Sequence, residues 1–200
     1  MITILDYSVN NLRSVQKAFE HLGHQTLVTS DPEIVVRAEK LVLPGVGAFG
    51  EAMRNLRAKN LVEPIAEAVA AGKYVMGVCL GMQLLFDWSE ELGLHQGLGI
   101  LEGKIEKFPA LPDLKVPHMG WSELHFPQES KLFAGLESGE MCYFVHSYHA
   151  VCAPEIVAAR GHHGMEFVAG VERENVMGAQ FHPEKSSAAG LQILDNFGKL

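Results

Sequence analysis

The stretch YVMGVCLGMQ, residues 74–83, joins an apolar run, a cysteine between two glycines and the start of a helical pattern. The apolar run predicts a buried strand over 74–78, and the pattern after it predicts a helix over 80–88. A strand, a sharp turn that carries a nucleophile and a helix together form a nucleophile elbow. Gly77 and Gly81 would let neighbouring chains approach where a β-carbon would clash.

Cys79 can be a nucleophile or a small residue of the core, and the pattern alone leaves both interpretations open. Free cysteine is among the residues most often buried as packing. Cys142 and Cys152 fit that role, because they lie in apolar strand patterns with no helix start beside them. A helix that begins at Leu80 would direct free N–H groups and its positive end toward the sulfur of Cys79. Such a helix would favour the thiolate and offer donors to an oxyanion.

Around this stretch, the first half of the chain alternates apolar runs with helical patterns. Strands are predicted at 2–5, 26–30, 40–45 and 74–78, and helices at 11–23, 48–56, 61–72 and 80–88. This rhythm predicts a parallel sheet with helices on both faces.

The second half is richer in extended segments. They are predicted at 99–108, 116–124, 141–152, 156–160, 166–173 and 176–184, and a last helix with a serine cap follows at 186–200. The expectation is an α/β fold with a mostly parallel central sheet and an antiparallel extension, in one domain over 1–200.

The composition excludes several classes of protein. The 200 residues carry a formal net charge of −8 and contain no Lys/Arg run, which argues against a nucleic-acid partner. No apolar run approaches the roughly 18 residues of a membrane helix, and the first residues lack the basic region of a signal peptide. Three cysteines without a CxxC motif suggest neither a zinc site nor a redox pair. We expect a cytoplasmic protein without a metal or cofactor.

A thiolate that transfers acyl groups needs a base and a group that orients the base. The segment FHPE places His182 and Glu184 two residues apart at the end of the extended segment 176–184. In an extended chain these side chains face the same side, so Glu184 could hold the imidazole in one tautomer. The alternative is a solvated loop with an incidental pair, and it would be preferred if the elbow were absent.

The segment PGVGAFG, residues 44–50, follows the predicted strand 40–45 and should reach the same sheet edge as Cys79. Its glycine-rich backbone could donate N–H groups to an oxyanion. A phosphate-binding loop is a rival interpretation, but neither GxxxxGK[ST] nor GxGxxG is present. An ordinary turn also stays open.

Taken in order, PGVGAFG, GVCLGMQLLF, PHMGW, YFVHSY and FHPEKS resemble the class I, triad-type glutamine amidotransferases. Within that class, they resemble the glutaminase subunits of imidazole glycerol phosphate synthases, which act in histidine biosynthesis. The resemblance covers nearly the whole chain. It implies a flavodoxin-like, three-layer α/β sandwich.

The resemblance also implies roles for the residues of the elbow and its surroundings. Cys79 would attack the side-chain amide of L-glutamine to give a glutamyl thioester and ammonia, His182 would move the protons, and Glu184 would orient His182. The N–H groups of Leu80 and Val46 would form the oxyanion hole. The resemblance also implies that the Gly45–Val46 peptide turns over before its N–H can donate to the oxyanion. The residues implied to hold glutamine are Gly47, Gln83, Glu91, His146, Ser147 and Tyr148. Without the resemblance, Gln83 would be interpreted as an exposed helix residue and Glu91 as part of a solvated acidic patch.

The family's partner is a (β/α)8-barrel cyclase subunit, which receives the ammonia through a tunnel. The heterodimer makes imidazole glycerol phosphate and an aminoimidazole carboxamide ribotide. Positions that face this partner are matched by Asn11, Trp121, Tyr143 and Lys185, although ordinary core packing is an alternative for the two aromatic residues.

The sequence departs from the family pattern in two motifs. DYSVNN has Ser8 and Asn10 where the family has glycines, which reduces the backbone freedom of the loop before Asn11. PHMGWS has Ser122 where the family has asparagine, and the shorter side chain would lose an interface hydrogen bond.

Three other functions stay open from the sequence. An amidotransferase subunit of another synthase, such as anthranilate or GMP synthase, should lack PHMGW and PGVGAFG. A catalytically inactive regulatory subunit has no need for Cys79, His182 and Glu184. A cysteine protease or hydrolase of similar fold would not be labelled at Cys79 by a glutamine-analogue electrophile.

Overall fold

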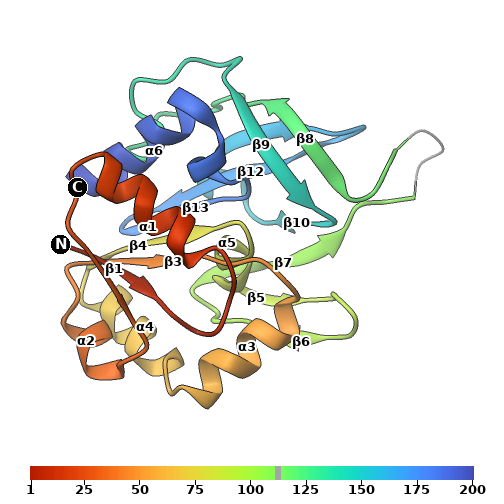
Figure 1. The fold of residues 1–200 in the computed structure, drawn as a ribbon. Helices are drawn as coiled ribbons and strands as arrows, with labels where there is room; N and C mark the ends of the chain where they lie inside the picture. Colours follow the sequence, from red (N-terminus) through yellow and green to blue (C-terminus); the bar gives the residue numbers. More distant parts are fainter. Residues whose placement is uncertain (111–113) are drawn as a thin grey trace.

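The computed structural model describes residues 1–110 and 114–200. Its largest sheet has seven strands in the order β11-β12-β13-β4-β3-β1-β2 (Figure 1). The parallel strands are β1 (Ile2–Leu5), β2 (Thr26–Thr29), β3 (Lys40–Leu43), β4 (Tyr74–Val78) and β13 (Val176–Ala179), and the antiparallel ones are β11 (Val157–His162) and β12 (Glu166–Arg173). The order β2-β1-β3-β4 is that of flavodoxin-like sheets, so the predicted mostly parallel sheet with an antiparallel extension is confirmed.

Helices cover both faces of this sheet and complete the three layers (Figure 1). On one face lie α1 (Leu12–His21) and α6 (Ser187–Lys199), and on the other lie α2 (Pro32–Arg37), α3 (Phe49–Ala58) and α4 (Val62–Ala70). Alternate side chains of β3 enter separate cores: Leu41 and Leu43 pack in the cluster that includes α3 and α4, and Val42 packs in the cluster that includes α1 and α6. Because both faces are covered, the strand reads as a continuous apolar run.

The helices were also compared with the requirements of a membrane span. Among residues 1–110 and 114–200, none of the helices is both long enough and apolar enough to cross a membrane.

Two smaller sheets lie beside the large one. One has the order β10-β7-β5-β6, and the other pairs β8 with β9. Their strands are β5 (Phe86–Ser89), β6 (His95–Gln96), β7 (Leu101–Lys107), β8 (His118–Glu123), β9 (Met141–His146) and β10 (Tyr148–Val151). The extended segment predicted over 141–152 is therefore divided at Ser147 between two sheets, and a short 3₁₀ turn, Pro154–Ile156, leads into β11.

The helix predicted over 80–88 is wrong beyond Leu84. Helix α5 (Leu80–Leu84) has five residues, and β5 follows it after one residue. Phe86 pairs with Leu101 of β7, and a short apolar run of this kind fits a strand as well as a helix. Helix α2 was not predicted, although Asp31 accepts a hydrogen bond from the N–H of Glu33 as an N-cap.

Two expectations for the end of the chain are also wrong. Strand β13 ends at Ala179, and a 3₁₀ turn, Pro183–Lys185, replaces the extended chain predicted over 176–184. Ser186 does not cap α6 through its side chain. Its hydroxyl donates to the carbonyl of His182 at 2.7 Å and accepts from the N–H of Tyr143 at 2.9 Å. The serine thus fastens the turn that carries Glu184 against β9.

The segments singled out in the sequence meet at one edge of the large sheet. Strands β13, β4, β3 and β1 are neighbours and run parallel, so their carboxyl ends lie side by side. The segments that follow these ends are 180–185, Cys79, 44–48 and 6–11. Ligands of open α/β sheets bind outside the carboxyl ends of the strands, so this edge is where a site is expected.

Replacing Gly81 with alanine should strongly destabilise the fold. A β-carbon there would lie 1.7 Å from the carbonyl oxygen of Leu43, so strand β3 or the elbow would have to move. We expect urea denaturation to show a free energy of unfolding lower by about 3 kcal/mol or more. Gly23→Ala is the control: its φ is +85° with nothing within 4 Å, so only left-handed strain of about 1–2 kcal/mol is added. Equal losses would contradict the close contact.

Candidate active site

Cys79 forms the turn between β4 and α5 in a strained conformation. Its φ of 53° and ψ of −111° are adopted by a residue with a side chain only where the surroundings enforce them. The N–H of Cys79 donates to Ala179 of β13 at 2.7 Å, and its carbonyl accepts from Gln83 at 3.3 Å. A β-carbon at Gly77 would lie 2.5 Å from the carbonyl oxygen of Gly81. The turn is thus anchored to the neighbouring strand and to its own helix, as an elbow requires.

His182 and Glu184 form a buried pair. Nδ1 of His182 lies 2.8 Å from Oε1 of Glu184, and their side chains are 0% and 1% exposed. Nε2, on the other side of the ring, has no regular hydrogen-bond partner among the described residues. The thiol of Cys79 is near enough to this ring to change its protonation. The arrangement therefore fixes an imidazole through one nitrogen and leaves the other for the nucleophile.

The charges of this pair are set by a balance of burial and contact. Burial by itself lowers the pKa of His182, but the contacts with Cys79 and Glu184 outweigh it and raise the pKa to about 10. Burial would raise the pKa of Glu184, but the hydrogen bonds from His182 and Asn11 hold it below its ordinary value. At neutral pH His182 is therefore an imidazolium that lies beside the sulfur of Cys79.

Asn11 contacts the same carboxylate, a role that the sequence did not predict. Its Nδ2 donates to Oε1 of Glu184 at 2.5 Å across 173 residues of sequence. Asn11 has φ 83° and Ser8 has φ 65°, so the loop forms in left-handed conformations without the family's glycines. The expected weakening of the loop by Ser8 is therefore confined to backbone strain. No spacing in the sequence could have indicated this contact.

A pocket of about 180 Å³ opens beside Cys79. Its lining includes the nucleophile, both predicted oxyanion-hole residues and all the residues predicted to bind glutamine. They are Val46, Gly47, Cys79, Leu80, Gln83, Glu91, His146, Ser147 and Tyr148. They come from the β3–α3 loop, the elbow, the β5–β6 loop and the β9–β10 connection. The structure thus brings together residues that are far apart in sequence, and their roles toward glutamine stay predictions.

Glu91 is held at the pocket wall by a helix N-terminus. Its Oε2 accepts from the N–H of Phe49, the first residue of α3, at 2.6 Å. Burial and the nearby charge of Glu91 raise the pKa of Tyr148, which lines the same pocket. A fixed carboxylate in this position suits an ammonium group.

Both ring nitrogens of His146 take part in a chain of hydrogen bonds within the protein. Its Nδ1 lies 2.8 Å from the carbonyl of Tyr148, and its Nε2 lies 3.1 Å from Nδ1 of His118. Nε2 of His118 lies 2.9 Å from the hydroxyl of Ser122. Burial lowers the pKa of His146 to about 3 and that of His118 to about 4, so both rings are neutral. Because a carbonyl only accepts, the proton of His146 is on Nδ1.

One predicted oxyanion donor is occupied by the chain itself. The N–H of Leu80 donates to the carbonyl of Gly45 at 3.4 Å. The Gly45–Val46 peptide therefore presents its oxygen, and not its N–H, toward the elbow. Tyr7, which the sequence analysis missed, is fully buried and donates its hydroxyl to the carbonyl of Pro44. This bond fixes the peptide before Gly45.

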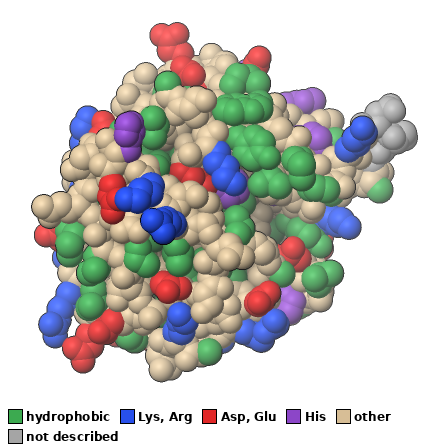
Figure 2. Space-filling model, in the orientation of Figure 1, with side chains coloured by type: hydrophobic (Ala, Val, Ile, Leu, Met, Phe, Trp, Pro, Cys, Tyr) green, Lys and Arg blue, Asp and Glu red, His purple; other side chains and the backbone are tan. Residues whose placement is uncertain are grey.

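Two of the residues predicted to face a partner, Trp121 and Tyr143, lie on strands β8 and β9. Trp121 is 47% exposed, which excludes core packing, and its ring centroid lies 6.0 Å from that of Tyr143 in an edge-on arrangement. Met119 and Met141 are also exposed on these strands, and Figure 2 shows hydrophobic side chains gathered over them. Lys185 is exposed directly after Glu184. The N–H of His182 donates to the carbonyl of Tyr143 at 3.0 Å, so the buried pair lies against the strand that carries part of this apolar patch.

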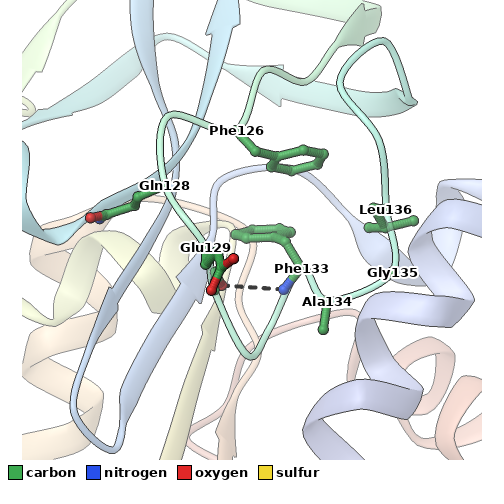
Figure 3. Close-up of a pocket in the computed structure, with 8 residues that line it drawn as sticks. Phe126, Gln128, Glu129, Phe133, Ala134, Gly135 and Leu136 are labelled. Atoms are coloured by element: carbon green, nitrogen blue, oxygen red, sulfur yellow. Dashed lines mark hydrogen bonds between the residues drawn. The ribbon is translucent and has the colours of Figure 1, made fainter.

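Elsewhere the described residues offer no comparable constellation. A larger hollow of about 560 Å³ lies along residues 126–136, where the rings of Phe126 and Phe133 are 5.3 Å apart (Figure 3). The residues that the structure describes in its lining include no histidine or cysteine. Across 1–110 and 114–200, no group of three His, Cys, Asp or Glu residues could hold a metal ion.

The sequence matches the family described as glutamine amidotransferase class-I over residues 3–199. The chain therefore belongs to the class I glutamine amidotransferases, as its motifs indicated. A crystal structure of a glutamine amidotransferase has the same fold, with a TM-score of 0.76 and 21% identity over 98% of each chain.

Within this family, the chain is similar along its whole length to one kind of subunit. It is 52% identical to the imidazole glycerol phosphate synthase subunit HisH of Syntrophotalea carbinolica, over 100% of both chains. It is 48% identical to the subunit of the same name from Geobacter sulfurreducens, over 100% of this chain and 98% of the relative.

The buried pair should stabilise the fold most between about pH 4.5 and 6.5. Because the pKa of His182 is raised, its contribution is complete below the ordinary value of 6.5 and is lost as the pH rises through about 10. Because the pKa of Glu184 is lowered, its contribution is complete above the ordinary value of 4.5 and is lost as the pH falls through the lowered one.

Urea denaturation across this pH range should show the effect as a difference between wild type and Glu184→Gln. The variant should lose most stability between pH 4.5 and 6.5 and approach the wild type toward both ends. Glu166→Gln, which removes a carboxylate from an exposed ion pair with Arg160, is the matched control and should follow the wild-type curve. A constant difference at every pH would contradict the assignment.

Proposed function

We propose that this chain is the glutaminase subunit of an imidazole glycerol phosphate synthase and supplies ammonia for histidine biosynthesis. The observation that carries the proposal is the buried His182–Glu184 pair beside Cys79. It lies next to a pocket lined by the residues predicted to bind the substrate glutamine. The full-length similarity to HisH subunits supports this synthase over other amidotransferase partners. Residues 1–200 act as one amidotransferase domain, consistent with a family match over 3–199.

The first chemical step forms a thioester. The thiolate of Cys79 attacks the side-chain amide carbon of glutamine, and the imidazolium of His182 gives its proton to the departing nitrogen. The C–N bond breaks, ammonia leaves, and a glutamyl thioester remains on the sulfur. Glu184 holds His182 in position and stabilises its positive charge, as the carboxylate does in related triads.

The second step restores the enzyme. The now neutral His182 takes a proton from water, and the resulting nucleophile attacks the thioester carbon. The C–S bond breaks, glutamate leaves, and the thiolate and imidazolium are regenerated. Side chains and water are sufficient for both steps, so the mechanism uses no cofactor.

Both steps pass through an oxyanion that needs two N–H donors. Leu80 becomes available when the Gly45–Val46 peptide turns over, which removes the carbonyl of Gly45 and brings in the N–H of Val46. A hydrogen bond of this kind contributes only about 1 kcal/mol net, so the turnover is accessible. The bond from Tyr7 to the carbonyl of Pro44 holds the Pro44–Gly45 peptide and so limits the movement to the peptide that follows Gly45.

The partner in this proposal is a (β/α)8-barrel cyclase subunit, which forms a heterodimer with the chain and receives ammonia through a tunnel. There the ammonia reacts with a ribulosyl aminoimidazole carboxamide nucleotide, which is cleaved to imidazole glycerol phosphate and an aminoimidazole carboxamide ribotide. The exposed Trp121, Met119 and Met141 supply an apolar surface for it, and Lys185 follows the triad carboxylate directly. Asn11 touches Glu184 from a loop assigned to the same interface, which links partner binding to the pair. We place the reaction in the cytoplasm, where three unpaired thiols persist.

Replacing Cys79 with alanine should separate the two halves of the reaction. Glutamine-dependent synthesis with the cyclase should fall roughly a thousandfold or more, because the thioester cannot form. Synthesis supplied with ammonium salts should stay at the wild-type rate, because the cyclase is untouched. A coupled assay of imidazole glycerol phosphate measures both rates. Cys152→Ala is the control and should change neither; survival of glutamine-dependent activity in Cys79→Ala would refute the mechanism.

Glutamine hydrolysis by the isolated chain should be weak and should rise on the order of a hundredfold when the cyclase and its ligand are added. The reason is that, in the chain alone, the Gly45–Val46 peptide presents its oxygen and not its N–H to the oxyanion hole. Equal hydrolysis rates with and without the cyclase would rule out this activation.

Replacing Trp121 with alanine should weaken cyclase binding by about 2 kcal/mol in calorimetry, because an exposed anchor ring is lost. Val36→Ala, on the exposed face of α2, is the control.

A further inference from the structure

Gln180 has no role in the mechanism above, yet its side chain touches the nucleophile. It lies directly after β13 and two residues before His182, and it is fully buried. Its Nε2 donates to the sulfur of Cys79 at 3.9 Å, and its Oε1 accepts from Nε2 of Gln83 at 2.9 Å. Its backbone N–H donates to the carbonyl of Ala169 at 2.9 Å, which fixes the position of the residue.

The orientation of the Gln180 amide follows from its neighbours. Nε2 of Gln83 also donates to the carbonyl of Tyr148 at 3.1 Å, and a carbonyl can only accept. The amide of Gln83 must therefore present its nitrogen to both Tyr148 and Gln180. Gln180 must therefore accept this hydrogen bond with its oxygen Oε1, which directs its nitrogen Nε2 at the sulfur of Cys79.

A donor in this position distinguishes between the two states of the sulfur. A neutral thiol is a weak acceptor, and 3.9 Å is long for such a bond. A thiolate is a charged acceptor, and hydrogen bonds to charged groups are shorter and stronger. The amide therefore stabilises the ionised sulfur. It has no proton to give up at neutral pH, so it does not compete with His182 in the transfer.

We propose that Gln180 is a further active-site residue that donates a hydrogen bond to the Cys79 thiolate and holds the sulfur toward the pocket. Its amide is oriented through Gln83 by the carbonyl of Tyr148. This proposal rests on the proposed function, because it assigns a second group to the same nucleophile. It joins the strand that would hold the substrate to the atom that attacks it.

The titratable groups that face Cys79 come from several elements. His182 approaches from the segment after β13, and Glu184 acts through it. Tyr7 approaches from the segment after β1, and its pKa is raised by burial and by the nearby Cys79. Glu91 and His146 line the same pocket as Cys79. Gln180 itself does not titrate, so its removal changes the hydrogen bonding of the sulfur without changing the formal charge of the site.

The test is the rate at which iodoacetamide alkylates Cys79 as a function of pH, without glutamine or partner. The thiolate displaces iodide, and the mass of the peptide that carries Cys79 reports the product. Burial raises the pKa of Cys142 to about 12 and that of Cys152 to about 11, so neither thiol competes near neutral pH. Gln180→Met keeps the length of the side chain and removes the donor. Gln180→Leu is a second apolar variant, and Gln192→Met on the surface of α6 is the control.

We expect Gln180→Met and Gln180→Leu to lower the alkylation rate at pH 7 roughly tenfold and to recover the wild-type rate at high pH. Gln192→Met should match the wild type throughout. A folded Gln180→Met protein with the wild-type pH profile would overturn the proposal. So would a loss of the same factor at every pH, which indicates displaced packing and not a less stable thiolate.

A measurement on the wild-type residue keeps the proposal testable if both variants fail to fold. In ¹⁵N-labelled protein, one side-chain N–H proton of Gln180 should move downfield as Cys79 ionises, and it should stay constant in Cys79→Ala. A resonance that does not respond to the titration would overturn the proposal. Both experiments omit glutamine and the cyclase, so a positive result stands even if the complex fails to hydrolyse glutamine. An active complex with unshifted profiles refutes Gln180 alone.

Discussion

The elbow and the end of strand β3 touch through backbone alone. A side chain at Gly81 would place its first carbon 1.7 Å from the carbonyl oxygen of Leu43, and one at Gly45 would place its first carbon 3.3 Å from the backbone nitrogen of Gly81. This approach sets the distance between the turn that carries Cys79 and the segment that would complete the oxyanion hole. Because the contact involves main-chain atoms, no change of rotamer can adjust it. The remaining groups of the site are arranged around this fixed pair.

The electrostatics of the site depend on placing charge where water is absent. Burying a carboxylate and an imidazolium is unfavourable unless each is paired and hydrogen-bonded. Glu184 receives hydrogen bonds from His182 and Asn11, and the carbonyl of His182 is held by Ser186. These contacts come from two parts of the chain, Asn11 and residues 182–186, which lie far apart in sequence. The pair is therefore stable only in the complete fold, and the fold determines the proton positions.

The parts that sequence reasoning predicted are those governed by local pattern. Strands such as β3 are continuous apolar runs because both faces are covered, and Cys79 between glycines has the spacing of an elbow. From Phe86 to Ser89 the spacing of apolar residues fits a helix and a strand equally well. The prediction of a helix was wrong there because pairing with β7 decides the outcome. Contacts such as Asn11 with Glu184 join residues 173 positions apart, and they follow from the order of the strands. The role of Ser186 was mistaken for a cap because a serine before a helix usually acts as one.

The bond between the N–H of Leu80 and the carbonyl of Gly45 can be considered as inhibition by a tethered ligand. A peptide oxygen on a short tether competes with a free molecule at an effective concentration in the millimolar range or above. In the proposed mechanism, glutamine can bind at Glu91 and Tyr148 while the N–H of Leu80 is still bonded to the carbonyl of Gly45. The reacting carbonyl of glutamine enters the oxyanion hole only after that bond breaks. Occupancy of the pocket and commitment to hydrolysis are then separate events. A chain of this design can remain loaded with substrate and release ammonia only on a signal.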